Sequence, residues 1–473
     1  MERPRLATWR LVTLYAVAAL VGLWARAWQL AGHRAMTWQD SHDYLTSSKS
    51  SWFGLDLWAG PRTPAIPVLF KLVGGDGQNA MALQVVLAAL CWAALATAVA
   101  AALPAGGRRW AAAALVVGVS LTWRTTMWDQ SLLSETVALA FLALVLGAVL
   151  QFVRHPTPRW GGAVVGSAAL WVSVRDAPSV ALLAGTAILV VVLVVGRPHP
   201  SQRATVLAAT AAGLAVVALL TMLAAQHGKR SVQPVEHVFS VRVLPYPDRV
   251  DWFADHGMPL ADEIAALGPP AYPVPTGPPV VGVPEDPPFD RWHDWVRSSG
   301  QATFARWMVT HPGYVVAEPL ERPERAYNNA EGNLEFYRLP DFEPVPLVGV
   351  LSVRTAWLLP VGLLTVAALI WFDRLRSPFG SAALALLVTA GPHGLAAWHS
   401  DGMETARHLV VPGMQVRLAV VLLAVGLLAR TERSQGPPVT WAMGTVAEST
   451  LAPIDDEEQN SDSRREFLDI SEA

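Results

Sequence analysis

Cysteine is nearly absent from this chain of 473 residues, in which Cys91 is the single example and lies inside a hydrophobic run. One cysteine excludes an intramolecular disulfide and any metal site built from several thiolates. We interpret Cys91 as a small buried residue. Lysine is also rare: the sequence has only Lys49, Lys71 and Lys229, against a large excess of arginine, a bias that suggests a GC-rich bacterial genome.

Charged residues are scarce as well, at 15% of the chain, whereas 52% of the residues are apolar and the mean hydropathy is positive. These values indicate a polytopic membrane protein. The sequence also lacks a glycine-rich phosphate loop between a strand and a helix, and GGDG at residues 74–77 is better interpreted as a turn. A soluble enzyme that uses nucleotide sugars is therefore not indicated. We expect the lipid bilayer as a partner and no nucleic acid.

Hydrophobic runs predict an all-α protein with about ten membrane-spanning helices, because about 20 mostly apolar residues are needed to cross the hydrocarbon core. The predicted spans are 11–31, 79–103, 110–127, 131–152, 160–175, 178–196, 204–225, 347–372, 379–398 and 410–429. The first span is preceded by Arg3, Arg5 and Arg10 but has no small-x-small cleavage pattern after it. We therefore expect it to remain uncleaved.

The distribution of basic residues predicts a cytoplasmic amino terminus. In that orientation the short inner connections hold thirteen arginines, whereas the short outer connections hold seven arginine and lysine residues. The positive-inside rule favours this arrangement. The protein is then expected in the cytoplasmic (inner) membrane, with the long loop at residues 32–78 on the outer side.

The spans divide the chain into four predicted regions. Residues 1–225 form an amino-terminal membrane domain, and residues 347–430 supply the carboxy-terminal membrane helices. Residues 226–346 lie between them as an extracytoplasmic segment. The last region, 431–473, contains the acidic run IDDEEQNSDSRRE and few apolar residues, so it is predicted to be a disordered cytoplasmic tail.

The extracytoplasmic segment has two distinct parts. Residues 269–288 are rich in proline, and residues 289–309 follow with tryptophans and other apolar residues largely at helical spacing. This spacing predicts a helix over 289–309 that lies on the bilayer or caps the membrane domain.

Ionisable residues are concentrated near the outer ends of the predicted spans. The set comprises Arg26, Glu135, Arg175, Asp176, Arg354, Arg407, His408 and Arg417. Charges within spans are costly and usually face a protein interior or an aqueous cavity. Any one of them could instead orient a helix through an ion pair or extend to the membrane surface. Because the set lies at one depth, it favours a functional site at the outer face.

The stretch WQDSHDY, residues 38–44, places two carboxylates, an imidazole and a phenol directly after the first span. If this stretch is helical, Asp40, Asp43 and Tyr44 share one face, whereas His42 points elsewhere. Such carboxylates could accept a proton from a sugar hydroxyl or hold a divalent cation such as magnesium or manganese. On these residues alone, a solvated loop that merely ends the span is the alternative.

The longer stretch WQDSHDYLTSSKSSWFGLDLWAGPRTPAIPVLFKLVGG resembles the first outer loop of the GT-C superfamily of lipid-linked membrane glycosyltransferases, which are related to protein O-mannosyltransferases and to the aminoarabinose transferases that act on lipid A. In those families an Asp after the first span is followed four positions later by Tyr, and then by an R-x-P-x-x-P element. The matching positions are Asp40, Tyr44, Arg62, Pro64 and Pro67. The later stretches SLLSETVALAFLAL, THPGYVV and METARHLVVPG follow in a similar order.

The resemblance implies a GT-C-like fold and makes Asp40 the catalytic carboxylate. Many relatives have Glu immediately after this Asp, whereas this chain has Ser41. Either Asp43 supplies the second carboxylate, or the metal-binding aspect of the family is weaker here.

Transfer of a sugar from a polyprenyl phosphate needs a base for the acceptor hydroxyl and charge stabilisation for the departing phosphate. We predict Asp40, with Asp43, for the first task. Arginine suits the second because its planar fork pairs with two phosphate oxygens. The predicted phosphate-binding residues are Arg62, Arg354, Arg407, His408 and Arg417, and the predicted acceptor-orienting residues are Tyr44, Asp129 and Glu135. Asp129 could instead be a helix N-cap, and Arg62 could contact a lipid headgroup.

The sequence thus predicts a membrane glycosyltransferase that moves a sugar from a polyprenyl-phosphate donor to a glycan, lipid or protein acceptor of the cell envelope. A lipid-linked glycan polymerase or ligase is a close alternative. A transporter is less favoured because its charges should lie nearer the midplane, often on broken and repeated helices. A non-enzymatic export component is the third alternative.

Overall fold

The computed structural model describes residues 3–195, 202–259, 289–321, 357–375, 377–402 and 405–429, and all structural statements concern these residues. They belong to one compact unit, residues 1–432. The predicted tail, the proline-rich stretch and the first part of the eighth predicted span lie outside the described residues.

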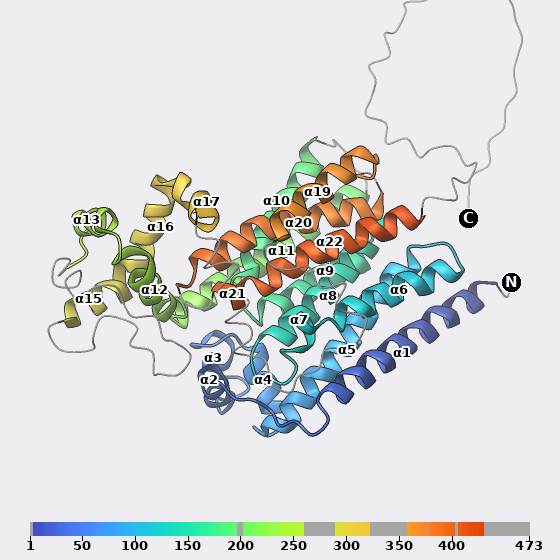
Figure 1. Cartoon of the computed structure of the whole chain (residues 1–473), viewed down its shortest axis with the longest axis horizontal. Helices are drawn as coiled ribbons and strands as arrows, with labels where there is room; N and C mark the ends of the chain where they lie inside the picture. Colours follow the sequence, from blue (N-terminus) through green and yellow to red (C-terminus); the bar gives the residue numbers. More distant parts are fainter. Residues whose placement is uncertain are drawn as a thin grey trace, which may run out of the picture. The chain divides into compact units, whose positions relative to one another are not determined.

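Helices account for the regular structure of the described residues, and each of the ten predicted spans overlaps a helix (Figure 1). These ten helices are α1 (Arg3–Gln29), α5 (Gly77–Ala101), α6 (Gly107–Ser120), α8 (Glu135–Arg154), α9 (Pro158–Val172), α10 (Pro178–Val195), α11 (Gln202–His227), α19 (Leu358–Trp371), α20 (Pro378–His399) and α22 (Val410–Leu428). Within the described ranges the only β-type pairing is a single bridge between Met36 and Ser131. The predicted all-α, multi-pass membrane class is confirmed.

Seven helical segments in the described part of the chain are long and apolar enough to cross a membrane. The other three, α6, α9 and α19, have 14, 15 and 14 residues. At about 1.5 Å per residue they reach little more than 20 Å, which is less than the hydrocarbon thickness of about 30 Å. The sequence explains the early end of α9, since Arg175 and Asp176 follow it and Pro178 starts the next helix.

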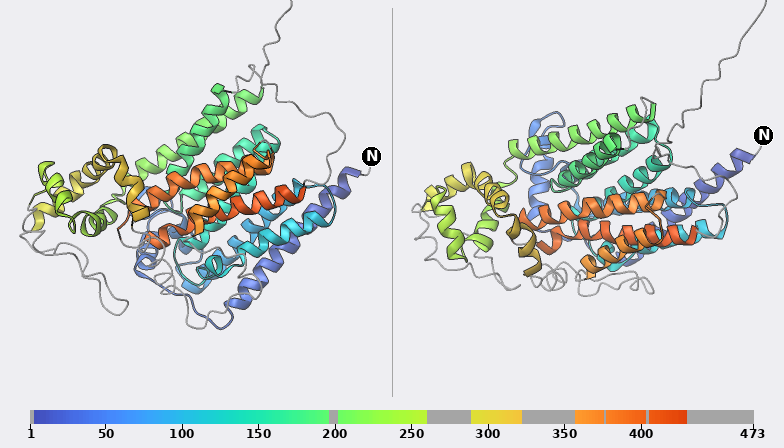
Figure 2. Two further views of the ribbon diagram at one scale, coloured as in Figure 1. Left: turned by 45° about the horizontal axis from the view of Figure 1, so that its top comes forward. Right: turned by 90° about the horizontal axis from the view of Figure 1, so that it is seen from above.

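The long helices run side by side, with α8 near the centre of the bundle (Figure 2). In the most apolar stretch of α8, 78% of the residues are buried, against 22% for α10, so α8 is surrounded by protein whereas most of the surface of α10 is exposed. Small residues allow close helix packing in the bundle. A Cβ atom added to Gly147 of α8 would lie 3.5 Å from the Cα atom of Leu95 in α5.

Shorter helices gather at one end of the long ones (Figures 1 and 2). Those near the amino-terminal half are α2 (Gln39–Ser48), α3 (Leu55–Ala59), α4 (Ala65–Leu72) and α7 (Trp123–Thr126). Those after α11 are α12 (Val232–Val238), the π-helix η1 (Phe239–Val243), α13 (Pro247–Asp255), α15 (Asp290–Trp295), the π-helix η3 (Val296–Gly300), α16 (Gln301–Thr310) and α17 (Pro312–Glu321). We call this second group the accessory helices. A last short helix, α21 (Thr405–His408), directly precedes α22.

The accessory helices confirm the predicted helix over 289–309 but change its surroundings. The chain is helical from Asp290 to Thr310. Its apolar side chains, including Trp292 and Phe304, are buried against Phe239 of η1 and Phe253 of α13. The apolar face therefore packs within a core that the accessory helices supply, and the prediction that the helix lies on the bilayer or caps the membrane domain stays a prediction.

Orientation in the membrane is a prediction that reporter fusions test. We expect a reporter that is active only outside the cytoplasm to be active when fused near Gly282 and inactive when fused near Gln459, because the arginine-rich connections should stay in the cytoplasm. A fusion within the short 155–157 connection serves as a second cytoplasmic control. The reverse pattern would overturn the orientation.

Candidate active site

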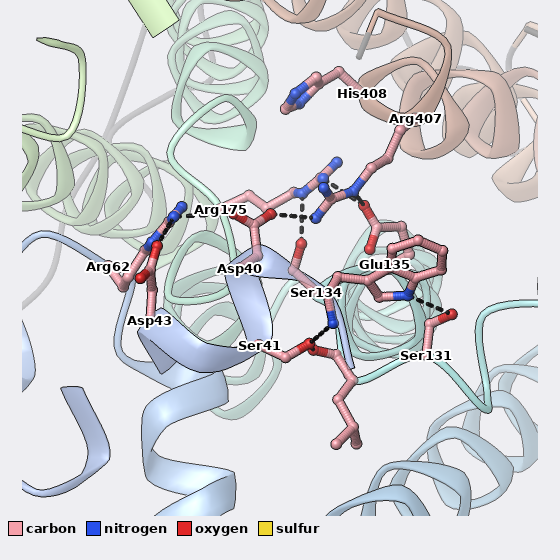
Figure 3. A network of polar contacts seen from close by, with 12 residues as sticks. Asp40, Ser41, Asp43, Arg62, Ser131, Ser134, Glu135, Arg175, Arg407 and His408 are labelled. Atoms are coloured by element: carbon pink, nitrogen blue, oxygen red, sulfur yellow. Dashed lines mark hydrogen bonds and ion pairs between the residues drawn. The ribbon is translucent and has the colours of Figure 1, made fainter. Parts of the chain in front are cut away.

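Six charged side chains from five parts of the chain form one line of alternating charge (Figure 3). In order they are Asp43, Arg62, Asp40, Arg407, Glu135 and Arg175. Arg62 contacts both carboxylates of α2, with its Nη2 2.9 Å from Asp40 Oδ1. Arg407 Nη2 lies 2.9 Å from Asp40 Oδ2, and its Nε donates to Glu135 Oε1, which also accepts from Arg175. We call this set the ionic cluster.

The ionic cluster is open at one end and sealed at the other. The Asp43 and Asp40 side chains are 43% and 23% exposed, whereas Glu135 is fully buried. Three carboxylates face three guanidinium groups, so the cluster carries no net formal charge. Among the described residues, Glu135 Oε2 has no hydrogen-bond partner, which leaves one oxygen of this buried carboxylate available to a further donor. The accessible surface for a reaction is therefore at Asp40 and Asp43.

Helix α2 is fixed to the segment that precedes α8, and this brings its carboxylates to Glu135. The backbones of Met36 and Gln130 are hydrogen bonded, and so are those of Met36 and Leu132. The Ser41 hydroxyl accepts from the Trp38 backbone N–H at 2.9 Å and donates to the Leu132 carbonyl at 2.8 Å. Ser41, which follows Asp40 directly, is thus a buried serine that anchors the helix.

Arg62 is held by the residues that follow it. The Thr63 hydroxyl donates to the Val174 carbonyl at 2.7 Å, and the Ala65 N–H donates to the Ser173 carbonyl at 2.9 Å. These carbonyls belong to the connection between α9 and α10, which also carries Arg175. One connection therefore positions two of the three arginines of the ionic cluster.

A close backbone contact at Gly60 fixes the start of the loop that carries Arg62. A Cβ atom on Gly228 would lie 2.0 Å from the Gly60 carbonyl oxygen, so only glycine fits there. Arg230 then donates from Nε to the Gly60 carbonyl and from Nη1 to Asp176, at 2.8 and 2.9 Å. The end of α11 and the α9–α10 connection thereby both hold the loop that carries Arg62.

The helical register confirms the predicted common face of α2. Asp40 and Asp43 both reach Arg62, and the Arg62 guanidinium lies 5.7 Å from the centre of the buried Tyr44 ring. His42 is exposed. Burial raises the pKa of the Tyr44 phenol to about 12, so this residue stays neutral and supports the guanidinium through its ring.

The ionisation of Asp40 is set by two opposing effects. Burial alone would raise the pKa of its carboxyl, but the guanidinium groups of Arg407 and Arg62 outweigh burial and hold the pKa below its usual value. Asp40 is therefore ionised at neutral pH. Its two oxygens each face an arginine, so its proton affinity is low.

The residues of α2 are poorly arranged for a divalent cation. The Arg62 guanidinium lies between Asp40 and Asp43, where a bound cation would have to lie. Within the described ranges, no group of three or more His, Cys, Asp or Glu side chains has the spacing of a metal site. Magnesium or manganese binding by these two carboxylates stays a prediction, and no step of the chemistry below passes through a metal.

Asp129 lies outside the ionic cluster. Its carboxylate pairs with Arg26 of α1 and accepts from the Thr136 hydroxyl at 3.1 Å. Arg26 also donates to the Ser120 carbonyl at 2.7 Å, and both charged side chains are 1% exposed. These contacts join α1, α6 and α8. The contacts favour a structural task for Asp129, and its predicted role in orienting an acceptor stays a prediction.

Two of the remaining predicted phosphate-binding residues, His408 and Arg417, also lie apart from Asp40. His408 points toward Asp401, with Nε2 3.2 Å from Oδ2. Arg417 is buried in the second turn of α22, near Arg124. Arg354 lies outside the described residues. Of the four predicted arginines, the structure brings Arg62 and Arg407 to Asp40.

Arg175 is the one member of the ionic cluster to which the sequence assigned no site role. Its Nε donates to the Ser134 hydroxyl at 2.8 Å, and its Nη2 donates to Glu135. Arg175 lies at the outer end of a predicted span, as Arg407 does, and this position could have indicated a site role for it. What the sequence could not supply is the pairing of both arginines with one oxygen of Glu135.

No protein-family model and no curated protein matches this sequence. Among solved structures, the chain is similar to the archaeal oligosaccharyltransferase AglB from Archaeoglobus fulgidus, in complex with an inhibitory peptide and a dolichol-phosphate. The identity is 14% and the TM-score is 0.41, over 88% of this chain and 50% of that chain. This chain therefore spans about half of AglB, and a likeness at this level carries no argument about function. The fold and the ionic cluster define a multi-pass helical membrane protein with a charged site at one end of its long helices.

Proposed function

We propose that this protein is a membrane glycosyltransferase of the GT-C type, which moves a sugar from a polyprenyl-phosphate donor to a hydroxyl of a cell-envelope acceptor at the outer face of the membrane. One observation carries the proposal: a partly exposed carboxylate, Asp40, lies between two arginines at one end of the helices that are long and apolar enough to cross a membrane. That arrangement supplies a base and a phosphate-binding fork at one place. The resemblance of residues 38–75 to the first outer loop of that superfamily supports the same assignment.

The donor phosphate would enter by exchange of partners. In the ionic cluster Arg62 and Arg407 already hold carboxylate oxygens at 2.9 Å, a geometry that phosphate oxygens also satisfy. When a phosphate takes over these guanidinium groups, Asp40 loses the two charges that keep its pKa low. Its proton affinity then rises at the moment when a base is required. The donor thus switches Asp40 from ion-pair partner to base.

The transfer step balances without a cofactor. The acceptor oxygen forms a bond to the anomeric carbon, and the bond between that carbon and the phosphate oxygen breaks. The bonding pair leaves with the phosphate, whose added charge Arg62 and Arg407 stabilise. The hydroxyl proton passes to Asp40. Asp43, which is more exposed and shares Arg62, is placed to orient the acceptor, and Glu135 fixes Arg407 and Arg175 from the buried side.

Purified protein in lipid nanodiscs tests the function directly. We expect it to transfer sugar from a polyprenyl-phosphate sugar to an acceptor recovered from the cell envelope, and a deletion strain should accumulate the unused donor. Arg407→Lys should raise the KM for the donor about tenfold, because a point charge replaces a fork that reaches Asp40 and Glu135 together. Arg34→Lys, at an exposed position of the 32–78 loop, is the matched control. Absence of transfer with every polyprenyl-phosphate sugar, together with no accumulated donor, would refute the function.

A further inference from the structure

A second buried arginine joins the accessory helices to the segment that leads to Arg407. Arg242 of η1 is 2% exposed. Its Nη1 donates to Glu318 of α17, and its Nη2 donates to the Trp398 carbonyl at 2.7 Å and to the Asp401 carbonyl at 3.2 Å. The same Nη2 lies 3.5 Å from the Thr405 hydroxyl, in the first residue of α21. One guanidinium therefore holds α17, the end of α20 and the start of α21.

Trp398 completes this arrangement. The Arg242 guanidinium lies 4.7 Å from the centre of a Trp398 ring, and the indole N–H donates to Glu318. Arg242 and Trp398 thus hold the same carboxylate, and each also contacts the other. A buried ion pair whose members are both hydrogen bonded is well suited to fix geometry, because loss of either partner leaves a buried charge without compensation.

The connection between α20 and α21 touches the accessory helices at a second point. His237 of α12 lies 3.3 Å from Asp401, and Asp401 also faces His408, the neighbour of Arg407. The backbone approach is equally close, since a Cβ atom on Gly402 would lie 2.3 Å from the His237 carbonyl oxygen. The accessory helices therefore contact the beginning of this connection directly and are linked to His408, the neighbour of Arg407, through Asp401.

From these contacts we infer that Arg242 is a positioning residue, through which the accessory helices hold Arg407 at the distance from Asp40 that donor binding requires. The role of Arg407 in donor binding rests on the proposed function. The role of Arg242 in positioning the segment rests on geometry alone. Arg242 does not itself reach the ionic cluster. Its task follows from the short path along the chain, in which Thr405 is both its contact and the residue two positions before Arg407.

The substitution Arg242→Lys tests this inference. Lysine keeps the charge opposite Glu318, but its single ammonium cannot also hold the carbonyls of Trp398 and Asp401. In nanodiscs without substrate, we expect amide exchange in peptides covering Thr405 to Leu409 to be about tenfold faster or more, because those carbonyl contacts no longer close the segment. Arg297→Lys is the control, because Arg297 lies in the same group of helices, is 55% exposed and pairs with Asp294 at 3.8 Å. Unchanged exchange in Arg242→Lys would overturn the inference.

A double-mutant cycle separates positioning from general loss of structure. Arg242→Lys should raise the donor KM by up to about tenfold in the wild-type background, no more than Arg407→Lys does, as expected for a displaced binding group. In the Arg407→Lys background the same change should have an effect of less than about twofold, because both substitutions impair one interaction. Effects that multiply would contradict positioning through Arg407.

Two further measurements keep the test decisive. If Arg242→Lys does not accumulate in the membrane, Trp398→Phe is the second variant. It removes the N–H that reaches Glu318 and part of the ring volume, keeps an aromatic ring beside Arg242, and should change exchange in the same direction. Unaltered exchange in Trp398→Phe would then count against the inference. If wild-type protein transfers no sugar, the proposed function fails, whereas the exchange measurement still decides whether Arg242 positions the segment.

Discussion

Asp40→Asn should abolish sugar transfer while leaving the protein folded and able to bind its donor. The amide keeps the size and reach of the carboxylate but cannot take a proton from the acceptor hydroxyl. Loss of a positioned general base lowers turnover by about 100- to 10,000-fold. Turnover of purified variant and wild type with saturating polyprenyl-phosphate sugar measures the effect on kcat, and donor binding is measured separately.

Two neighbouring carboxylates provide the controls for that experiment. Asp43→Asn should have a smaller effect, because Asp43 is 43% exposed and shares Arg62 without contacting Arg407. Asp56→Asn, on an exposed face of α3, should leave turnover near that of the wild type. Undiminished turnover in Asp40→Asn would remove Asp40 from the mechanism. Equal losses in the Asp40 and Asp43 variants would indicate that the two carboxylates act as one unit, for example around a metal.

Asp129→Asn should destabilise the membrane bundle far more than it alters turnover. The substitution leaves the Arg26 guanidinium buried without a compensating charge, and breaking a buried ion pair in this way costs about 3–5 kcal/mol. The loss is measured as a fall in the unfolding midpoint of purified protein in detergent. Turnover per folded molecule should stay within about twofold of wild type, because Asp129 lies outside the ionic cluster.

Removal of both charges gives the matched comparison. Arg26→Leu combined with Asp129→Leu leaves no buried charge, so this double variant should be more stable than Asp129→Asn alone. A turnover loss in folded Asp129→Asn as large as that in Asp40→Asn would instead support the predicted acceptor-orienting role for Asp129.

The positions of the long helices were predictable because hydrophobic length is a strong signal for spans. The ends of the helices were less predictable. The predicted span at 110–127 is broken, because α6 ends at Ser120 and a turn at Leu121 leads to a separate short helix, α7, which carries Arg124. The environment of residues 289–309 was also hidden. An apolar helical face fits a bilayer and a small protein core equally well, and only the packing of Phe239 and Phe253 against it decides between them.

The ionic cluster was predictable only in part, because some of its relations are local in the sequence and others are not. The i, i+3 and i+4 spacing places Asp40, Asp43 and Tyr44 on one face, and that relation is local. Pairing between distant parts of the chain cannot be predicted in this way, since Arg407 pairs with Glu135, 272 positions away in the sequence. Asp129 illustrates the same limit, because nothing near it in the sequence indicates that Arg26, 103 positions away, lies beside it. Arginines at one depth were visible, but their choice of carboxylate depends on how the helices pack.

The alternation of three carboxylates with three guanidinium groups has a consequence for selectivity against soluble anions. A cluster whose positive charges are already matched exerts little attraction on an ion that approaches from water, so free phosphate and nucleotide sugars gain little by displacing Asp40 from its arginines. A donor with a polyprenyl chain differs, since its tail partitions into the bilayer and presents its phosphate at high local concentration beside the helix ends. The matched charges of the ionic cluster would then be enough to favour lipid-linked phosphates over dissolved ones. No gate would be needed to exclude soluble competitors.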